Sequence, residues 1–244
     1  MNENLRIDDA LEAATGRLQA CSESPRLDAE LLLARALDVQ RSYLFAHPDD
    51  EMDPQAARRF ATAVQQRFDG MPMAYITGSR EFWSLPLIVS PATLVPRPDT
   101  ETLVEQALVR IPRKAECQIA DLGTGSGAIA RALARERPLC HLTATDQAED
   151  ALAVAAQNAQ HLNIPNIEFV TGNWTEPLRG RQFDLIVSNP PYVASDDPHL
   201  AALRFEPRSA LDAGEDGLDA IRILAATVAA LLKPGGHVLL EHGD

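Results

Sequence analysis

The stretch DLGTGSG, residues 121–127, lies at the junction of an apolar run, CQIADLG (117–123), and a helical pattern, GAIARALARER (127–137). Its glycines allow the tight backbone turns through which a chain leaves a buried strand and begins a helix. The helix that follows presents free N–H groups and the positive end of its dipole to the turn. This stretch therefore predicts a strand–turn–helix unit with a ligand site at the turn.

Strand-like and helical patterns continue to alternate after this unit. Predicted strands cover 117–123, 141–146, 167–173, 183–189 and 237–244, and predicted helices cover 127–137, 148–162 and 217–233. Such alternation is typical of a parallel sheet with helices on both faces, whose strands end at one edge. We expect an α/β fold of the Rossmann-like kind, with any ligand site along that edge. The long connection from 193 to 217 predicts a functional cover or a disordered loop.

The first 75 residues carry helical patterns only, with Pro25 and Pro54 at expected first positions of helices. We expect a small helical bundle whose core contains Ile7, Leu11, Ala14, Leu18, Leu27, Leu31, Ala34, Phe60, Val64 and Phe68. Residues 76–100 alternate apolar residues with Pro and Ser, which predicts a β-hairpin or an extended linker. The α/β domain is then expected over 101–244.

Composition narrows the class of protein. The chain has 244 residues, of which 45% are hydrophobic, enough for one large domain or two unequal ones. Its net charge of −13, without a basic stripe, argues against duplex nucleic acid and favours a protein partner. The longest apolar run, 223–232, is about half a membrane span, and no secretory signal is visible. Three cysteines without zinc-ligand spacing favour a reduced, cytoplasmic protein.

Two carboxylates indicate the kind of ligand that the glycine turn takes. Asp121 precedes the glycines, where it favours an ammonium group and disfavours a pyrophosphate. Asp146 ends the second predicted strand, where an acidic side chain bridges ribose hydroxyls; it can also cap the next helix. A nucleoside with an amino-acid tail and no phosphates, S-adenosylmethionine, fits both residues. Trp174, after the third strand, either lies against the adenine or packs at the edge of the sheet.

A second motif, SNPPY (188–192), ends the fourth predicted strand. The prolines make a stiff turn that can aim two acceptors, the side-chain oxygen of Asn189 and the carbonyl of Pro190, at a substrate NH₂ group. Holding that nitrogen in line with an activated methyl group accelerates transfer without a strong general base. Tyr192 supplies a planar face. The motif leaves open whether the nitrogen belongs to an amide or to adenine, and a purely structural turn is the alternative.

Together these motifs resemble one family over essentially the whole chain. The matching segments are ESPRLDAELLLA (23–34), REFWSLPLIVSPATLVPRPDTE (80–101), DLGTGSGAIA (121–130), SNPPY (188–192) and RFEPRSAL (204–211). The chain is similar to the peptide chain release factor N(5)-glutamine methyltransferases, the HemK/PrmC family. The NPPY motif is shared with adenine methyltransferases, but its combination with PRPDTE is specific to this family.

The resemblance implies a Rossmann-like S-adenosyl-L-methionine-dependent methyltransferase domain behind a helical domain that recognises class 1 peptide chain release factors. The substrate would be the glutamine of their Gly-Gly-Gln loop, with no membrane or direct nucleic-acid partner. Implied donor-binding residues are Asp121, Gly123, Thr124, Gly125, Ser126, Gly127, Asp146, Trp174 and Asn189. Implied substrate-binding residues are Asn189, Pro190, Pro191 and Tyr192, of which Asn189, Pro190 and Tyr192 would be catalytic. The PRPDTE segment would help to wall the site.

Two departures from the family pattern carry further expectations. Asn173 stands where the family has an acidic residue, which affects contacts to the adenine. Family members continue past LLEHGD into two further strands, so we expect a chain that lacks them, with an apolar edge strand and lower stability. Three other functions remain open at this point: N6-adenine methylation of nucleic acid, a non-catalytic module that binds donor or release factor, and a nicotinamide-dependent dehydrogenase.

Overall fold

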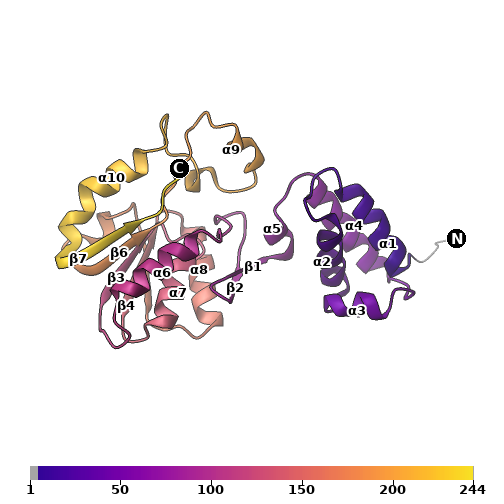
Figure 1. Cartoon of the computed structure of the whole chain (residues 1–244), viewed down its shortest axis with the longest axis horizontal. Coiled ribbons are helices and arrows are strands. Elements are labelled where there is room, and N and C mark those ends of the chain that lie inside the picture. The colour runs from indigo at the N-terminus through magenta and orange to yellow at the C-terminus, as the bar shows by residue number, and fades with distance from the viewer. Residues whose placement is uncertain (1–4, 244) are drawn as a thin grey trace. The chain divides into compact units, whose positions relative to one another are not determined.

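The computed structural model describes residues 5–243, and the chain divides into two compact units. The first unit covers Met1–Gly78 and the second covers Ser79–Asp244. Their elements are labelled in Figure 1.

The described residues of the first unit form helices joined by short connections, with one isolated β-bridge between Arg6 and Glu51. Its helices are α1 (Ile7–Leu18), α2 (Pro25–Leu37), α3 (Arg41–Ala46), α4 (Pro54–Phe68) and α5 (Met73–Thr77). The predicted apolar face of α1 is buried in the core of the unit, together with Phe60 and Val64 of α4. The Asp53 carboxylate caps α4 by accepting hydrogen bonds from the N–H groups of Gln55 and Ala56.

The predicted core is wrong for three residues. Leu27 and Leu31 are 40% and 38% exposed, and Phe68 is also exposed. Helix α2 instead buries the face that carries Ala29, Leu32, Leu33 and Ala36. That face also holds Asp28, whose carboxylate accepts hydrogen bonds from Ser22 and from Arg67. Apolar residues occur on most sides of α2, and an acidic residue lies on the face that is buried. The apolar period therefore predicts the wrong face of this helix.

The second unit begins with an antiparallel hairpin of β1 (Ser79–Phe82) and β2 (Leu85–Ile88), followed by α6 (Thr100–Arg110). Trp83 and Ser84 form the turn of the hairpin with φ values of 54° and 53°. The Trp83 N–H group donates a hydrogen bond of 2.8 Å to the Glu101 carboxylate, which attaches the turn to α6.

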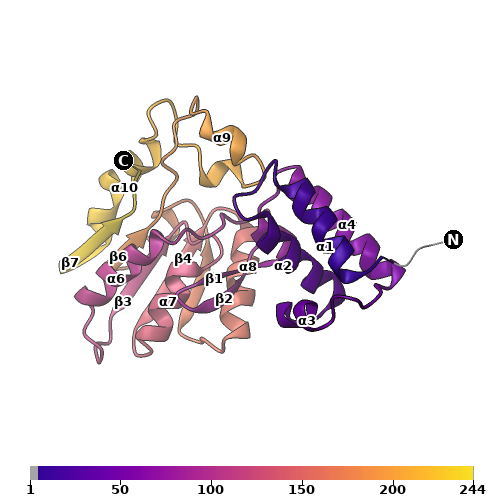
Figure 2. The same cartoon turned by 45° about the vertical axis from the view of Figure 1, so that its right-hand side comes forward.

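A five-stranded parallel sheet forms the centre of this unit, in the order β5-β4-β3-β6-β7. Its strands are β3 (Gln118–Leu122), β4 (His141–Asp146), β5 (Ile167–Thr171), β6 (Phe183–Ser188) and β7 (Leu232–Leu240). Helices α6, α7 (Ala128–Glu136) and α8 (Glu149–His161) lie on one face, and α10 (Asp219–Thr227) lies on the other (Figures 1 and 2). The α/β architecture predicted from the alternating patterns is confirmed.

Two segments differ from the sequence patterns. Helix α10 ends at Thr227, a 3₁₀ turn η3 (Val228–Leu231) follows, and β7 already begins at Leu232. The PGG sequence therefore lies inside β7, where the pairing with β6 shifts register and so tolerates a proline. The 193–217 connection is ordered, with α9 (His199–Ala202), the 3₁₀ turn η2 (Arg208–Ala210) and a bridge between Val193 and Asp212.

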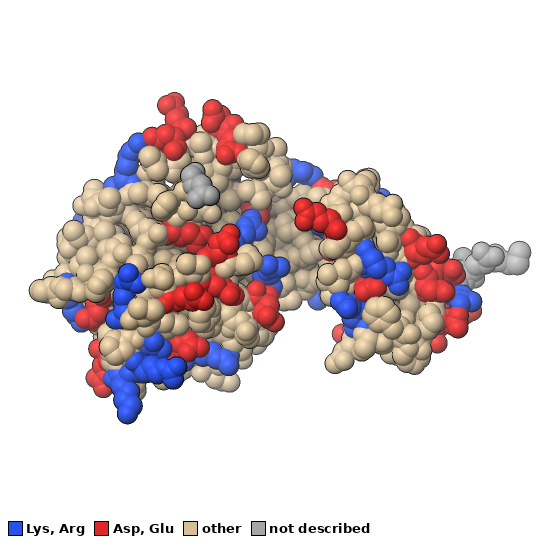
Figure 3. All heavy atoms as spheres, in the orientation of Figure 1, with Lys and Arg blue, Asp and Glu red and all other residues tan. Residues whose placement is uncertain are grey.

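Figure 3 shows acidic and basic side chains interspersed over the visible face of each unit. Among the described residues, no helix is long and apolar enough to cross a membrane.

A buried amide fastens the hairpin to the glycine turn of the second unit. Asn158 of α8 is almost fully buried, and its Nδ2 donates hydrogen bonds of 2.9 Å to the carbonyls of Ile88 and Ser126. Its Oδ1 accepts a bond of 2.7 Å from the Ile88 N–H group. One side chain thus joins β2 to the loop that opens α7.

We expect Asn158→Ala to lower the free energy of unfolding by about 3 kcal/mol, because three buried hydrogen bonds are lost. Urea denaturation followed by tryptophan fluorescence measures this, since Trp83 and Trp174 both belong to the second unit. The control is Gln157→Ala, an exposed position on the same helix, with a change below about 0.5 kcal/mol. Equal stability of the two variants would contradict the structural role of Asn158.

Candidate functional site

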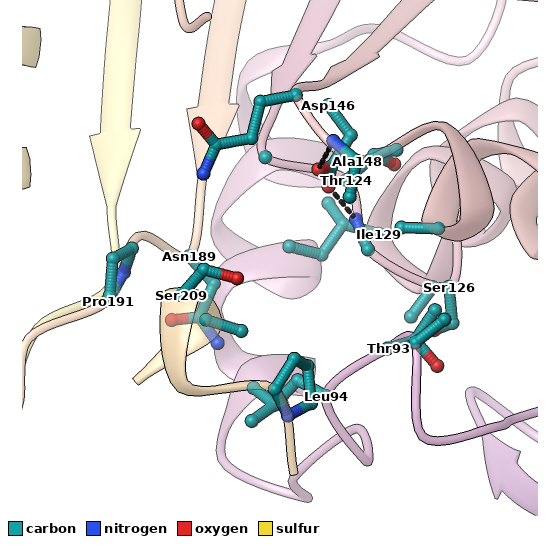
Figure 4. Close-up of a pocket in the computed structure, with 18 of the residues that line it drawn as sticks. Thr93, Leu94, Thr124, Ser126, Ile129, Asp146, Ala148, Asn189, Pro191 and Ser209 are labelled. Carbon is teal, nitrogen blue, oxygen red and sulfur yellow. Dashed lines mark hydrogen bonds between the residues drawn. The ribbon is translucent and has the colours of Figure 1, made fainter. Parts of the chain in front are cut away.

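A cavity lies at the edge of the sheet where its strands end. The loops after β3, β4, β5 and β6 line it, together with residues of the 92–100 segment and of the 207–210 segment. Figure 4 shows Asp146 and Thr124 on one side of this cavity and Asn189, Pro191 and Ser209 on another. The parallel sheet therefore brings the two sequence motifs to a single cavity.

Most of the predicted site residues line this cavity. They are Gly123, Thr124, Gly125, Ser126, Asp146, Trp174, Asn189 and Pro191. The remaining four, Asp121, Gly127, Pro190 and Tyr192, lie outside its lining.

The three glycines of the turn are required for different reasons. All have positive φ values, of 72°, 56° and 79° for Gly123, Gly125 and Gly127. A Cβ atom on Gly123 would lie 3.0 Å from the Trp174 ring, and one on Gly127 would lie 3.1 Å from Ala155 of α8. A Cβ atom on Gly125 would meet nothing within 4 Å. Gly125 therefore leaves its backbone open to the cavity, while Gly127 lets α7 and α8 approach.

Asp146, at the end of β4, is fixed by two backbone donors. Its Oδ2 accepts a hydrogen bond of 2.9 Å from the Gly125 N–H group, and its Oδ1 accepts one of 3.0 Å from Ala148 (dashed lines in Figure 4). The N-cap residue of α8 is Ala148, so the predicted capping role of Asp146 is replaced by a turn within 146–148. Each carboxylate oxygen retains a lone pair for a hydroxyl in the cavity.

Asp121 braces the glycine turn from inside the protein. It is 0% exposed, and its Oδ2 accepts hydrogen bonds from the Thr124 hydroxyl at 2.7 Å and from the Ala130 N–H group at 3.1 Å. Its Oδ1 has no hydrogen-bond partner among the described residues. Burial raises the pKa of this carboxyl to about 6, against the lowering effect of its two hydrogen bonds.

Trp174 has contacts on two sides. Its backbone has φ of 46°, and its ring lies against Gly123, so that the side chain lines the main cavity. It also packs against the cluster formed by β3, β6, α10 and η3, and it lines a second cavity next to α10. The two roles predicted for this residue, a wall of the ligand site and a packing aromatic, are therefore compatible in geometry.

The NPPY segment leaves β6 with its asparagine at the cavity. Asn189 is half-buried, and its Nδ2 donates a hydrogen bond of 3.2 Å to the Thr100 hydroxyl. Pro190 is buried, whereas Pro191 lines the cavity. Tyr192 is half-buried with its ring against Gly243, and burial, followed by the charge of Glu241, raises the pKa of its hydroxyl.

The sequence patterns do not predict which side chain holds the outer walls of the cavity together. Glu206 is buried; its Oε2 accepts a hydrogen bond of 2.9 Å from the Val95 N–H group, and its Oε1 pairs with Arg97 at 2.5 Å. This carboxylate ties the 193–217 connection to the 92–100 segment, so that both become walls. Its contacts are 109 and 111 residues away along the chain, beyond the reach of periodicity and spacing.

Comparison with known proteins agrees with these features. Residues 9–78 match the family described as PrmC N-terminal domain, and residues 99–210 match the methyltransferase small domain. The fold is shared with the solved T. thermophilus 16S rRNA N2 G1207 methyltransferase, with a TM-score of 0.52 and 20% identity over 66% of this chain and 40% of that one.

Two relatives are much more similar in sequence, and both are named release factor glutamine methyltransferase. The protein from Xylella fastidiosa (strain Temecula1) is 54% identical over 96% of this chain and 83% of its own length. The protein from Escherichia coli (strain K12) is 50% identical over 96% of this chain and 84% of its own length. With both motifs at one cavity and this identity over nearly the whole chain, the protein belongs to the release factor glutamine methyltransferase family.

Proposed function

We propose that this enzyme transfers a methyl group from S-adenosyl-L-methionine to the side-chain amide nitrogen of the glutamine in the Gly-Gly-Gln motif of class 1 peptide chain release factors. The proposal rests on one observation: residues of two sequence motifs line the same cavity. The glycine turn with Asp146 lines one side, and Asn189 of the NPPY segment lines another. Family membership supports the same acceptor.

Polar groups that line the cavity, and one carboxylate behind its lining, fit the proposed donor. Asp121 has a buried oxygen without a partner in the described residues, suited to an ammonium group, directly or through water. Asp146 offers lone pairs to ribose hydroxyls, and Gly125 leaves room beside its backbone. Trp174 lies where it can contact a flat base. When bound, this donor supplies a methyl group that its sulfonium already activates.

The acceptor side requires positioning more than proton removal. The Oδ1 atom of Asn189 and the Pro190 carbonyl are suited to accept hydrogen bonds from a substrate NH₂ group and to favour the positive charge that develops on its nitrogen. Asp146 is the only ionisable side chain among the described residues that line the cavity. A mechanism without a general base agrees with this lining.

We assign recognition of the release factor to the first unit. It carries exposed apolar side chains, among them Leu27, Leu31 and Phe45, and it matches the N-terminal domain of the family. A net charge of −13 favours a protein partner over nucleic acid. A cytoplasmic location follows from a release-factor substrate and agrees with three cysteines that form no disulfide.

The test is methyl transfer in purified components. The enzyme is incubated with S-adenosylmethionine carrying a tritiated methyl group and with either a release factor, the same factor with its motif glutamine changed to glutamate, or DNA. We expect label in the first only. Label in DNA alone would replace the proposal with adenine methylation, and donor binding without any transfer would make the protein a non-catalytic module.

Asn189 and Asp146 should affect different ligands: Asn189 positions the methyl acceptor, and Asp146 binds the methyl donor. We expect Asn189→Ala to lower kcat about a hundredfold or more and to change the donor Kd less than about threefold. Asp146→Ala should instead weaken donor binding about tenfold or more, because its carboxylate holds both a ligand hydroxyl and the glycine turn. Calorimetry and single-substrate kinetics measure the two effects. Equal loss of donor affinity in both variants would contradict this division.

We expect Asp121 to lower the free energy of unfolding at neutral pH and to strengthen binding of the methyl donor. Its raised pKa means that the stability it contributes is present below about pH 4 and is lost as the pH rises through about 6. At neutral pH we expect Asp121→Asn to unfold with a higher free energy than the wild type, by up to about 3 kcal/mol, and to bind donor more weakly. Urea denaturation at neutral pH and below about pH 4 measures the stability, and calorimetry measures donor affinity. A variant less stable than the wild type at neutral pH would contradict the prediction.

A further inference from the structure

The amide of Asn189 has to be turned the right way for the reaction proposed above. Its oxygen and its NH₂ group have nearly the same shape but opposite hydrogen-bonding character. Only the orientation with Oδ1 toward the cavity can accept a hydrogen bond from a substrate NH₂ group. The reversed orientation would present donors to donors.

Strand register brings an acidic residue next to this amide. Ser188 of β6 pairs with Leu240 of β7, and the Glu241 N–H group donates a hydrogen bond of 3.0 Å to the Ser188 carbonyl. Asn189 and Glu241 are therefore the next residues on two adjacent parallel strands. Thr100, the first residue of α6, reaches the same point because α6 packs on both β6 and β7.

The three side chains lie next to one another. The Nδ2 of Asn189 donates a hydrogen bond of 3.2 Å to the Thr100 hydroxyl, and the Glu241 carboxylate is close enough to both side chains to influence, and be influenced by, their hydrogen-bonding groups. Thr100 is only 4% exposed, so water does not substitute freely for these contacts. A carboxylate only accepts hydrogen bonds, so the Asn189 group that faces it is the NH₂. The Thr100 hydroxyl accepts the hydrogen bond from Asn189, which leaves its own hydrogen available to the neighbouring Glu241 carboxylate.

We infer that Thr100 and Glu241 are positioning residues that fix the Asn189 amide with Oδ1 toward the cavity. The NH₂ group then faces the Thr100 hydroxyl and the Glu241 carboxylate, both of which can accept a hydrogen bond, and Oδ1 is left for the substrate. A reversed amide would place Oδ1 against the carboxylate and leave two donors without acceptors. The inference rests on the proposed function, because the orientation matters only for a substrate that donates a hydrogen bond.

Two opposing influences act on the carboxyl of Glu241. Burial raises its pKa, while the neighbouring Thr100 and Asn189 side chains oppose that rise. Its Oε2 is buried without a hydrogen-bond partner among the described residues, so this carboxylate has unused capacity to accept hydrogen bonds from the Thr100–Asn189 pair.

The first test compares variants of Thr100 by steady-state methyl transfer to the release factor. We expect Thr100→Val, which keeps the shape and removes the hydroxyl, to lower kcat about tenfold with an unchanged donor Kd. Thr100→Ser should restore kcat to within about twofold, because it returns the hydroxyl. The matched control is Thr102→Val, an exposed position on the same helix, with wild-type kinetics. A Thr100→Val enzyme with wild-type kcat would overturn the inference.

A double-mutant cycle tests whether Thr100 acts through Asn189. If it does, Thr100→Val should have no further effect on kcat in an Asn189→Ala background. A further tenfold loss in that background would assign Thr100 a direct or purely structural role and reject the positioning role. Failure of the wild type to methylate a release factor would reject the proposed function, which is a different outcome from either result.

Nuclear magnetic resonance tests the arrangement without activity. The side-chain NH₂ signals of Asn189, assigned by their loss in Asn189→Ala, should exchange slowly with water in the wild type. Thr100→Val and Glu241→Leu should speed this exchange, since each removes an acceptor, whereas Thr102→Val should not. Fast exchange already in the wild type would show an amide that is not held and would overturn the inference.

Discussion

Parallel pairing of β3 with β4 and β6, and of β6 with β7, is the constraint on which the site depends. Parallel strands end at the same edge, so residues far apart in sequence meet there without any further device. The glycine turn follows β3, Asp146 ends β4, and Asn189 follows β6. The same register places Glu241 beside Asn189. Sheet geometry thus sets the relative positions of the donor side, the acceptor side and the group that supports the acceptor side.

The remaining walls come from segments that the sheet does not position, and single buried polar side chains attach them. Glu206 holds the 193–217 connection to the 92–100 segment, and Asn158 holds the hairpin to the glycine turn. In both cases one side chain satisfies several backbone or charged groups that would otherwise be buried alone. A cavity built from separate segments is kept in shape by these few hydrogen bonds.

The sequence predicts local features well and long-range contacts poorly. The strands, the glycine turn and the shared edge follow from patterns within about twenty residues, because apolar period and turn chemistry are local. The core face of α2 does not follow, since the Asp28–Arg67 pair makes part of it charged. The Glu206 contacts and the Thr100–Asn189–Glu241 group depend on which strands and loops become neighbours, and spacing in one sequence carries no measure of that.

The unpartnered oxygen of Asp121 has a consequence for how folding and binding are related. Its Oδ1 is a buried acceptor without a donor among the described residues, and a bound ammonium group would supply that donor. Binding of the ligand would then stabilise the folded state. Donor binding is therefore expected to raise the temperature at which the second unit unfolds.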